Sequence, residues 1–122
     1  MVIEQSHQPP GEIQLALDAL EMHKARDLVV MDLRGLCDAT DFFIIASGTS
    51  DTHVRALAGS VVEAQRRGGQ RPHHVEGLAG GRWVLLDFVD FVVHVFHPTL
   101  REFYQLERLW ADAPAVSMGS SR

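Results

Sequence analysis

The sequence predicts an α/β fold in which a mixed sheet of about five strands carries three helices, mainly on one face. Three observations support this prediction. Two segments place apolar residues three and four positions apart, the repeat of a helix with one buried face. Short runs of β-branched and aromatic residues, which favour strands, alternate with these segments. Helices and strands in such an order are typical of layered α/β domains.

The first half of the domain is predicted to contain a helix, two strands and a second helix. The helical repeat covers residues 12–25, and apolar runs of strand length follow at 28–31 and 42–46. The turn at 47–50 ends in hydroxyl residues that can cap a helix. The helix that follows this turn should stop at Gly68, because glycine is favoured just beyond a helix end.

The second half is predicted to contain three strands and a third helix. A weak strand is expected at 72–76, followed by a glycine-rich turn at 77–81. The apolar run at 83–96 is too long for one ordinary strand, so we divide it into two strands that turn near 89–90. A helix is expected at 98–111, because it would begin on a proline, which the first helical turn tolerates.

Composition indicates one folded domain of a cytoplasmic protein. We expect a loose lead-in at 1–10, a single domain at 11–113 and a disordered tail at 114–122. Cys37 is the only cysteine, no apolar run could cross a membrane, and the start lacks the pattern of an export signal. The net charge of −5 disfavours direct binding to DNA or RNA and favours a basic protein partner.

The alternation of side chains along the last two strands indicates a binding surface. Three helices are few for two faces of five strands, so one face should stay open to a partner. A mixture of aromatic, aliphatic, carboxylate and imidazole side chains is typical of protein-binding surfaces. The alternation places Trp83, Leu85, Asp87, Val92, His94 and Phe96 on the open face, and all of these except Val92 are the predicted contact residues. Alternatively, the two aromatic rings pack under a loop, or the face pairs with a second copy to give a homodimer.

Neither a metal site nor a cofactor site is expected. His73 and His74 are neighbours, and His94 and His97 are three apart, so on a strand each pair points to opposite faces and cannot share an ion. The turn at 47–50 precedes a helix N-terminus, which could cradle a phosphate. It matches neither a P-loop nor a dinucleotide-binding motif, and it is equally well explained as a capped turn.

Two stretches resemble one known family. The first is TDFFIIASGTS at 40–50, and the second is GRWVLLDFVDFVVHVF at 81–96, which continues as REFYQLERLW at 101–110. Together they resemble the Iojap family, known in bacteria as the ribosomal silencing factor, over about residues 12–113. Trp83 and His94 belong to the phrase that carries the resemblance, as does Asp87.

The resemblance implies a nucleotidyltransferase-like fold and a non-enzymatic role. Family members bind a protein on the interface side of the large ribosomal subunit, obstruct joining of the small subunit and repress translation when nutrients are limiting, as in stationary phase. Two positions depart from the family pattern: Phe42 stands where a tyrosine is usual, and Val89 stands where a glycine is usual.

The enzymes that share the implied fold supply the alternative hypothesis. A nucleotidyltransferase-like enzyme would use the turn at Ser47-Gly48 together with nearby carboxylates. Such enzymes need a Gly-Ser order and an Asp-x-Asp pair that holds metal. Here the order is Ser-Gly, and Asp51 has no aspartate two residues later. The sequence therefore favours a binding protein over an enzyme.

Overall fold

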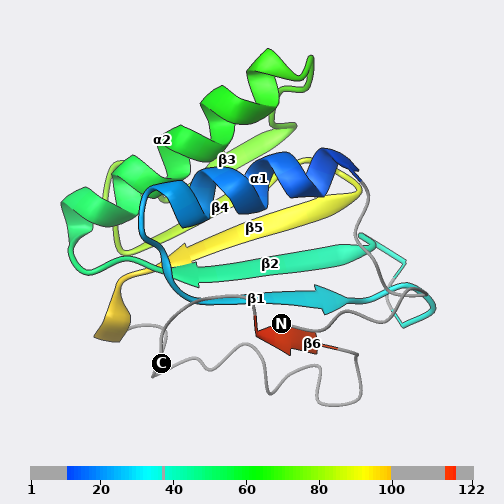
Figure 1. Ribbon diagram of the computed structural model, residues 1–122, viewed down its shortest axis with the longest axis horizontal. Helices are drawn as coiled ribbons and strands as arrows, with labels where there is room; N and C mark the ends of the chain where they lie inside the picture. The colour runs from blue at the N-terminus through cyan, green and yellow to red at the C-terminus, as the bar shows by residue number, and fades with distance from the viewer. Residues whose placement is uncertain (1–10, 37, 100–114, 118–122) are drawn as a thin grey trace.

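The computed structural model describes residues 11–36, 38–99 and 115–117, in which two helices lie against one face of a mixed sheet (Figure 1). The helices are α1 (Gly11–Met22) and α2 (Asp51–Arg67). The strands are β1 (Arg26–Asp32), β2 (Phe42–Ser47), β3 (His74–Glu76), β4 (Trp83–Asp87), β5 (Phe91–Phe96) and β6 (Ala115–Ser117). Of the third helix expected at 98–111, only Pro98 and Thr99 are described, and their backbone is helical; the remainder lies outside the described residues.

The sheet has the strand order β3-β4-β5-β2-β1-β6. Strands β2 and β5 run parallel, and the other neighbouring strands run antiparallel, so the predicted mixed sheet is confirmed. All five predicted strands are present. A sixth, β6, pairs with β1 in the region 114–122, where no strand was expected. A three-residue strand carries too little periodicity to be recognised, and its pairing with a distant strand defines it.

Helix α1 buries the apolar repeat that predicted it, with its core side chains 1% exposed or less: Ile13, Ala16, Leu17 and Leu20. It ends at Met22, three residues earlier than expected, because the chain turns at Lys24, which has a positive φ of 67°. The chain then enters β1 at Arg26.

Helix α2 begins and ends as the sequence predicted. Ser50 is the N-cap, and its hydroxyl oxygen accepts a hydrogen bond of 3.1 Å from the backbone N–H of His53. Gly68 is the C-cap. A Cβ atom on Gly48 would lie 2.9 Å from Val54, so the absence of a side chain there lets the first turn of α2 pack against the end of β2.

The β4–β5 hairpin turns where the sequence predicted. Phe88 donates its backbone N–H to the carbonyl oxygen of Phe91 at 2.9 Å, which closes the turn around Val89 and Asp90. Val89 has φ of 77°, a left-handed conformation that a β-branched side chain disfavours. The turn is therefore strained at Val89.

Apolar side chains gather on both faces of the sheet. The larger cluster lies under α1 and α2 and includes the strand residues Val84, Leu86, Phe88, Phe91, Val93 and Val95, as the alternation predicted. A smaller cluster lies on the opposite face, where Met31, Leu33, Ile45 and Phe96 are buried and Val29, Phe43 and Trp83 pack against them. Neither described helix is both long and apolar enough to cross a bilayer.

Candidate protein-binding face of the sheet

Cross-strand pairing brings the predicted contact residues together on the face opposite the helices. Trp83 pairs with Phe96, and Leu85 pairs with His94. Directly paired residues in antiparallel strands point to the same face of the sheet. Asp87 follows Leu85 by two positions and so shares that face. The face is called here the docking face, and it is defined by these five residues.

The five residues differ in exposure. Trp83, Leu85 and Asp87 on β4 are half-buried. His94 is only 5% exposed and Phe96 is 0% exposed, whereas the sequence placed them on an open surface. The reason is the packing around them: Phe43 lies against His94, Trp83 lies against Phe96, and Phe96 belongs to the buried cluster with Met31, Leu33 and Ile45. His94 and Phe96 therefore support the surface that the β4 residues form.

Four rings form a packed cluster behind this surface. The centroids of Trp83 and Phe96 are 5.0 Å apart, and Phe43 meets His94 edge-on with centroids 4.8 Å apart. The indole Nε1 of Trp83 donates a hydrogen bond of 3.2 Å to Nδ1 of His94. Burial lowers the pKa of His94 to about 4, so its imidazole is neutral near pH 7.

Strand β3 extends the docking face with charged side chains that sequence reasoning missed. His74 pairs with Asp87, and Glu76 pairs with Leu85, which places both β3 side chains on the same face as their partners. His74 and Glu76 are exposed, and their Nε2 and Oε2 atoms lie 2.6 Å apart. The alternation of His74 and Glu76 around Val75 was the available signal, but only three residues carry it. The docking face thus has an acidic border beside Leu85, formed by Glu76 and Asp87.

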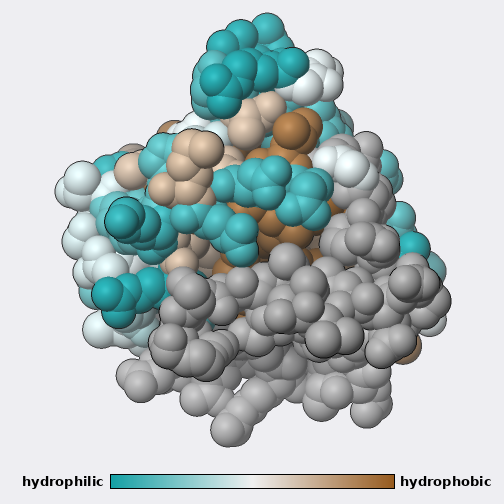
Figure 2. All heavy atoms as spheres, in the orientation of Figure 1, coloured by the Kyte–Doolittle hydropathy of each residue, from teal (hydrophilic) through white to brown (hydrophobic). Residues whose placement is uncertain are grey.

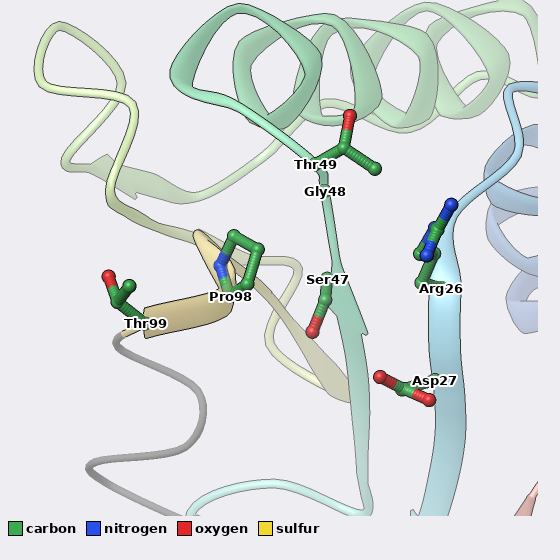
Figure 3. A pocket seen from close by; sticks show the side chains of 7 residues that line it. All are labelled: Arg26, Asp27, Ser47, Gly48, Thr49, Pro98 and Thr99. Carbon is green, nitrogen blue, oxygen red and sulfur yellow. The ribbon is translucent and has the colours of Figure 1, made fainter. Parts of the chain in front are cut away.

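A separate cavity of about 480 Å³ lies where β2 ends and α2 begins (Figure 3). Its lining comes from the start of β1, the end of β2 and the segment after β5: Arg26, Asp27, Ser47, Gly48, Thr49, Pro98 and Thr99. This is the region that the enzymatic alternative would use. The glycine in it is accounted for by the packing of Val54, so it does not by itself indicate a ligand.

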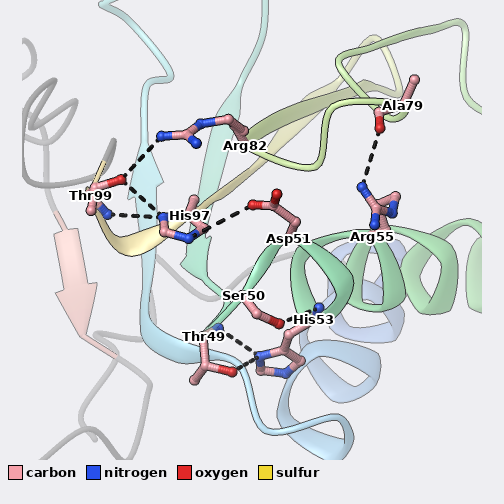
Figure 4. A network of polar contacts seen from close by, with 9 residues as sticks. All are labelled: Thr49, Ser50, Asp51, His53, Arg55, Ala79, Arg82, His97 and Thr99. Atoms are coloured by element: carbon pink, nitrogen blue, oxygen red, sulfur yellow. Dashed lines mark hydrogen bonds and ion pairs between the residues drawn. The ribbon is translucent and has the colours of Figure 1, made fainter.

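The polar groups beside this cavity tie segments of the chain together (Figure 4). His53 accepts the backbone N–H of Thr49 at 2.8 Å through Nδ1, while its Nε2 lies 2.9 Å from the carbonyl oxygen of His23. Asp51 lies 3.8 Å from Nε2 of His97. Among the described residues, no three histidine, cysteine, aspartate or glutamate side chains are grouped as a metal site requires.

The helix-bearing side has an apolar groove of its own, between α1 and α2, with a volume of about 410 Å³. Figure 2 shows apolar side chains between hydrophilic ones on this side of the molecule. Leu15 and Met22 at the groove are 39% and 75% exposed. Neither is aromatic, whereas the docking face offers a half-buried tryptophan, the residue type most enriched among energetically dominant contacts. The docking face is therefore the stronger candidate.

Comparison with known proteins gives a consistent set of relatives. The family model described as "Ribosomal silencing factor during starvation" matches residues 5–122. The ribosomal silencing factor of Halalkalibacterium halodurans is 40% identical over 106 residues, which cover 87% of this chain and 91% of that protein. The mouse protein named "Mitochondrial assembly of ribosomal large subunit protein 1" is 33% identical over 102 residues, 81% of this chain and 45% of that protein.

Solved structures agree with the sequence matches. A crystal structure from Bacillus halodurans superposes with a TM-score of 0.77 at 38% identity, covering 87% of this chain and 96% of that one. A crystal structure from Chromobacterium violaceum superposes with a TM-score of 0.80 at 36% identity, covering 91% and 93% of the two chains. The described fold is therefore shared with proteins that are also similar in sequence.

Proposed function

This chain belongs to the family of ribosomal silencing factors, and we propose that it represses translation by binding the large ribosomal subunit and blocking the joining of the small subunit. The family name supports a role in translation during starvation. The name of the mouse relative supports the large subunit as the partner. We infer that the protein acts in the cytoplasm.

The observation that carries the proposal is the docking face. Trp83 and Leu85 are half-buried and offer apolar contact area. Glu76 lies opposite Leu85 and Asp87 lies on the same face, so carboxylates border the apolar centre. An apolar centre with a charged rim is the usual anatomy of a protein interface. We infer that the partner is a ribosomal protein on the interface side of the subunit.

Charge supports a protein partner over ribosomal RNA. The chain carries a net charge of −5, and the docking face adds carboxylates where it would meet the subunit. Phosphate groups would repel such a surface, whereas a basic ribosomal protein would attract it and speed the encounter. The docking face of this chain would then contact the ribosomal protein, and ribosomal RNA would lie outside the contact area.

The proposed mechanism is steric and involves no catalytic step. A folded domain seated on the interface side would occupy space that the small subunit needs. Repression then depends only on occupancy, so its strength should follow the affinity of the docking face for the large subunit. The same face could instead pair with a second copy, in which case a homodimer would compete with the ribosome for one surface.

The test is a subunit-joining assay. Purified large and small subunits are mixed with and without the protein, and light scattering follows the formation of joined ribosomes. The proposal predicts a lower yield when the protein is added to large subunits first. An unchanged yield at saturating protein would refute it.

The nucleotidyltransferase alternative is tested separately. We expect no tight binding of ATP in the presence of Mg²⁺, because the described cavity lacks an Asp-x-Asp pair and its polar neighbours are engaged in structural contacts. Calorimetric titration measures this directly. Micromolar affinity that is lost in an Asp51→Asn variant would support the enzyme instead.

A further inference from the structure

The hydrogen bond between Trp83 and His94 determines which ring nitrogen of the histidine carries the proton. An indole N–H can only donate, so Nδ1 of His94 must be the acceptor at the far end of this 3.2 Å contact. A neutral imidazole has one N–H, and that N–H must then be on Nε2. The contact therefore selects one tautomer of His94.

Aromatic packing holds the imidazole in the orientation that this contact needs. Phe43 meets the ring edge-on, with an interplanar angle of 72°, and Phe96 lies nearly parallel to it at 10° with a centroid separation of 6.1 Å. His94 is only 5% exposed. Side chains confined in this way keep a single rotamer, so Nδ1 remains directed at the indole.

The other nitrogen of His94 makes the imidazole costly to bury. Nε2 is buried and has no hydrogen-bond partner in the described part of the chain. A buried donor without a partner destabilises the folded state, and a phenylalanine in the same space would avoid that cost. What the imidazole supplies and phenylalanine cannot is the acceptor for the indole N–H.

We propose that His94 is a positioning residue, whose Nδ1 holds the indole of Trp83 in the orientation that the docking face presents to its partner. This inference rests on the proposed function, in which Trp83 contacts a ribosomal protein. The ring of Phe96 supports one side of the indole at 5.0 Å, and the hydrogen bond to His94 fixes its rotation. An indole that is already ordered in the free protein loses little rotational freedom when the partner binds, so the entropic cost of binding is smaller.

The experiment separates the positioning of the indole from the binding of the ribosome. The sequence contains two tryptophans, so a Trp110→Phe background leaves Trp83 as the only indole. In that background, ¹⁵N–¹H NMR of the Nε1–H group reports its hydrogen bond and its exchange with water, with no ribosome present. Binding of each variant to purified large subunits is measured in parallel.

Three variants distinguish positioning from mere packing. His94→Phe keeps an aromatic ring but removes the acceptor, whereas His94→Asn places an amide oxygen near the position of Nδ1. Phe43→Leu is the matched control, because it alters a ring contact of His94 and leaves the acceptor in place. All three are checked for folding by the dispersion of their amide resonances.

The proposal predicts a graded result. In His94→Phe, the Trp83 Nε1–H resonance should move and exchange with water at least about tenfold faster, and affinity for the large subunit should fall about two- to tenfold. His94→Asn should recover most of both, and Phe43→Leu, which loosens one ring contact but keeps the acceptor, should change both less than His94→Phe does. If His94→Phe leaves the indole resonance unchanged, or changes it without lowering affinity, positioning is refuted. If the unsubstituted protein binds no large subunit, the proposed function fails whatever the indole shows.

Discussion

The backbone N–H of Val89 donates a hydrogen bond of 2.8 Å to Oδ1 of Asp87, across the turn that joins β4 to β5. Val89 holds φ at 77° in this turn, and its side chain is 53% exposed. Asp87 also lies on the docking face, opposite His74. One carboxylate therefore stabilises a strained turn and contributes charge to the surface proposed to bind the ribosome.

Replacing Val89 with glycine should stabilise the protein. A left-handed backbone costs an ordinary residue about 1–2 kcal/mol, and glycine avoids this cost while adding freedom to the unfolded chain. Since Val89 is largely exposed, little apolar burial is lost. We expect Val89→Gly to raise the free energy of unfolding by about 0.5–1 kcal/mol, measured by urea denaturation. Val89→Ala, which keeps a Cβ atom, is the control and should gain less; a less stable glycine variant would show that the turn is not strained.

The two roles of Asp87 can be separated by two substitutions. Asp87→Asn removes the charge but keeps an oxygen that can accept the Val89 N–H, so stability should change by less than about 0.5 kcal/mol. Association with the large subunit should become several-fold slower and less dependent on salt, because a rim charge mainly affects the association rate. Asp87→Ala should in addition lose about 1 kcal/mol of stability. Equal association rates for the aspartate and asparagine proteins would remove Asp87 from the interface.

Truncating Trp83 should weaken binding strongly. Loss of a dominant interface residue costs at least about 2 kcal/mol, or roughly thirtyfold in affinity. Because Trp83 also packs on Phe96 and bonds to His94, Trp83→Ala should lower the melting temperature as well. Leu86→Ala is the matched control: its side chain is 0% exposed on the helix-covered face, and it should cost about 2–5 kcal/mol of stability. The folded fraction of the Leu86→Ala protein should bind normally; weaker binding by it than by Trp83→Ala would mean that the faces are reversed.

Lowering the pH should reduce the free energy of unfolding, because His94 is buried in its neutral form. Burial lowers its pKa from 6.5 in the unfolded chain to about 4 in the folded protein. The unfolded chain therefore binds the proton more readily than the folded protein. The stability that comes from keeping His94 neutral is fully present above about pH 6.5 and is lost as the pH falls toward 4. The loss approaches about 3 kcal/mol. The chain has seven histidines, so the measurement is the difference between the unsubstituted protein and His94→Phe in urea denaturation at several pH values. A constant difference would show that His94 titrates normally.

Local patterns were sufficient to predict the described helices and every described strand except β6. Helix α2 could be delimited because a capping hydroxyl, a helical repeat and a C-terminal glycine all agree. The run at 83–96 could be divided because its length exceeds one strand, and the turn lies where it was expected. The alternation of side chains along β4 and β5 predicted which residues lie on which face of the sheet. Val84 and Leu86 are buried beneath the helices, as predicted.

Features that depend on contacts between distant segments could not be predicted. The parallel pairing of β2 with β5 joins strands far apart in the sequence, and it brings Phe43 of β2 against His94, which is buried. The pairing of β3 with β4 brings His74 and Glu76 to the docking face. The hydrogen bond from Trp83 to His94 depends on register across a hairpin and on ring orientation, neither of which composition determines.

The most direct test of the central claim is co-sedimentation of the purified protein with separated ribosomal subunits at physiological salt. Equal concentrations of large subunits, small subunits and joined ribosomes are centrifuged with the unsubstituted protein and with Trp83→Ala. We expect the unsubstituted protein to pellet with free large subunits and much less with small subunits or joined ribosomes, and Trp83→Ala to remain in the supernatant. Equal pelleting with both subunits, or no pelleting with either, would contradict the account.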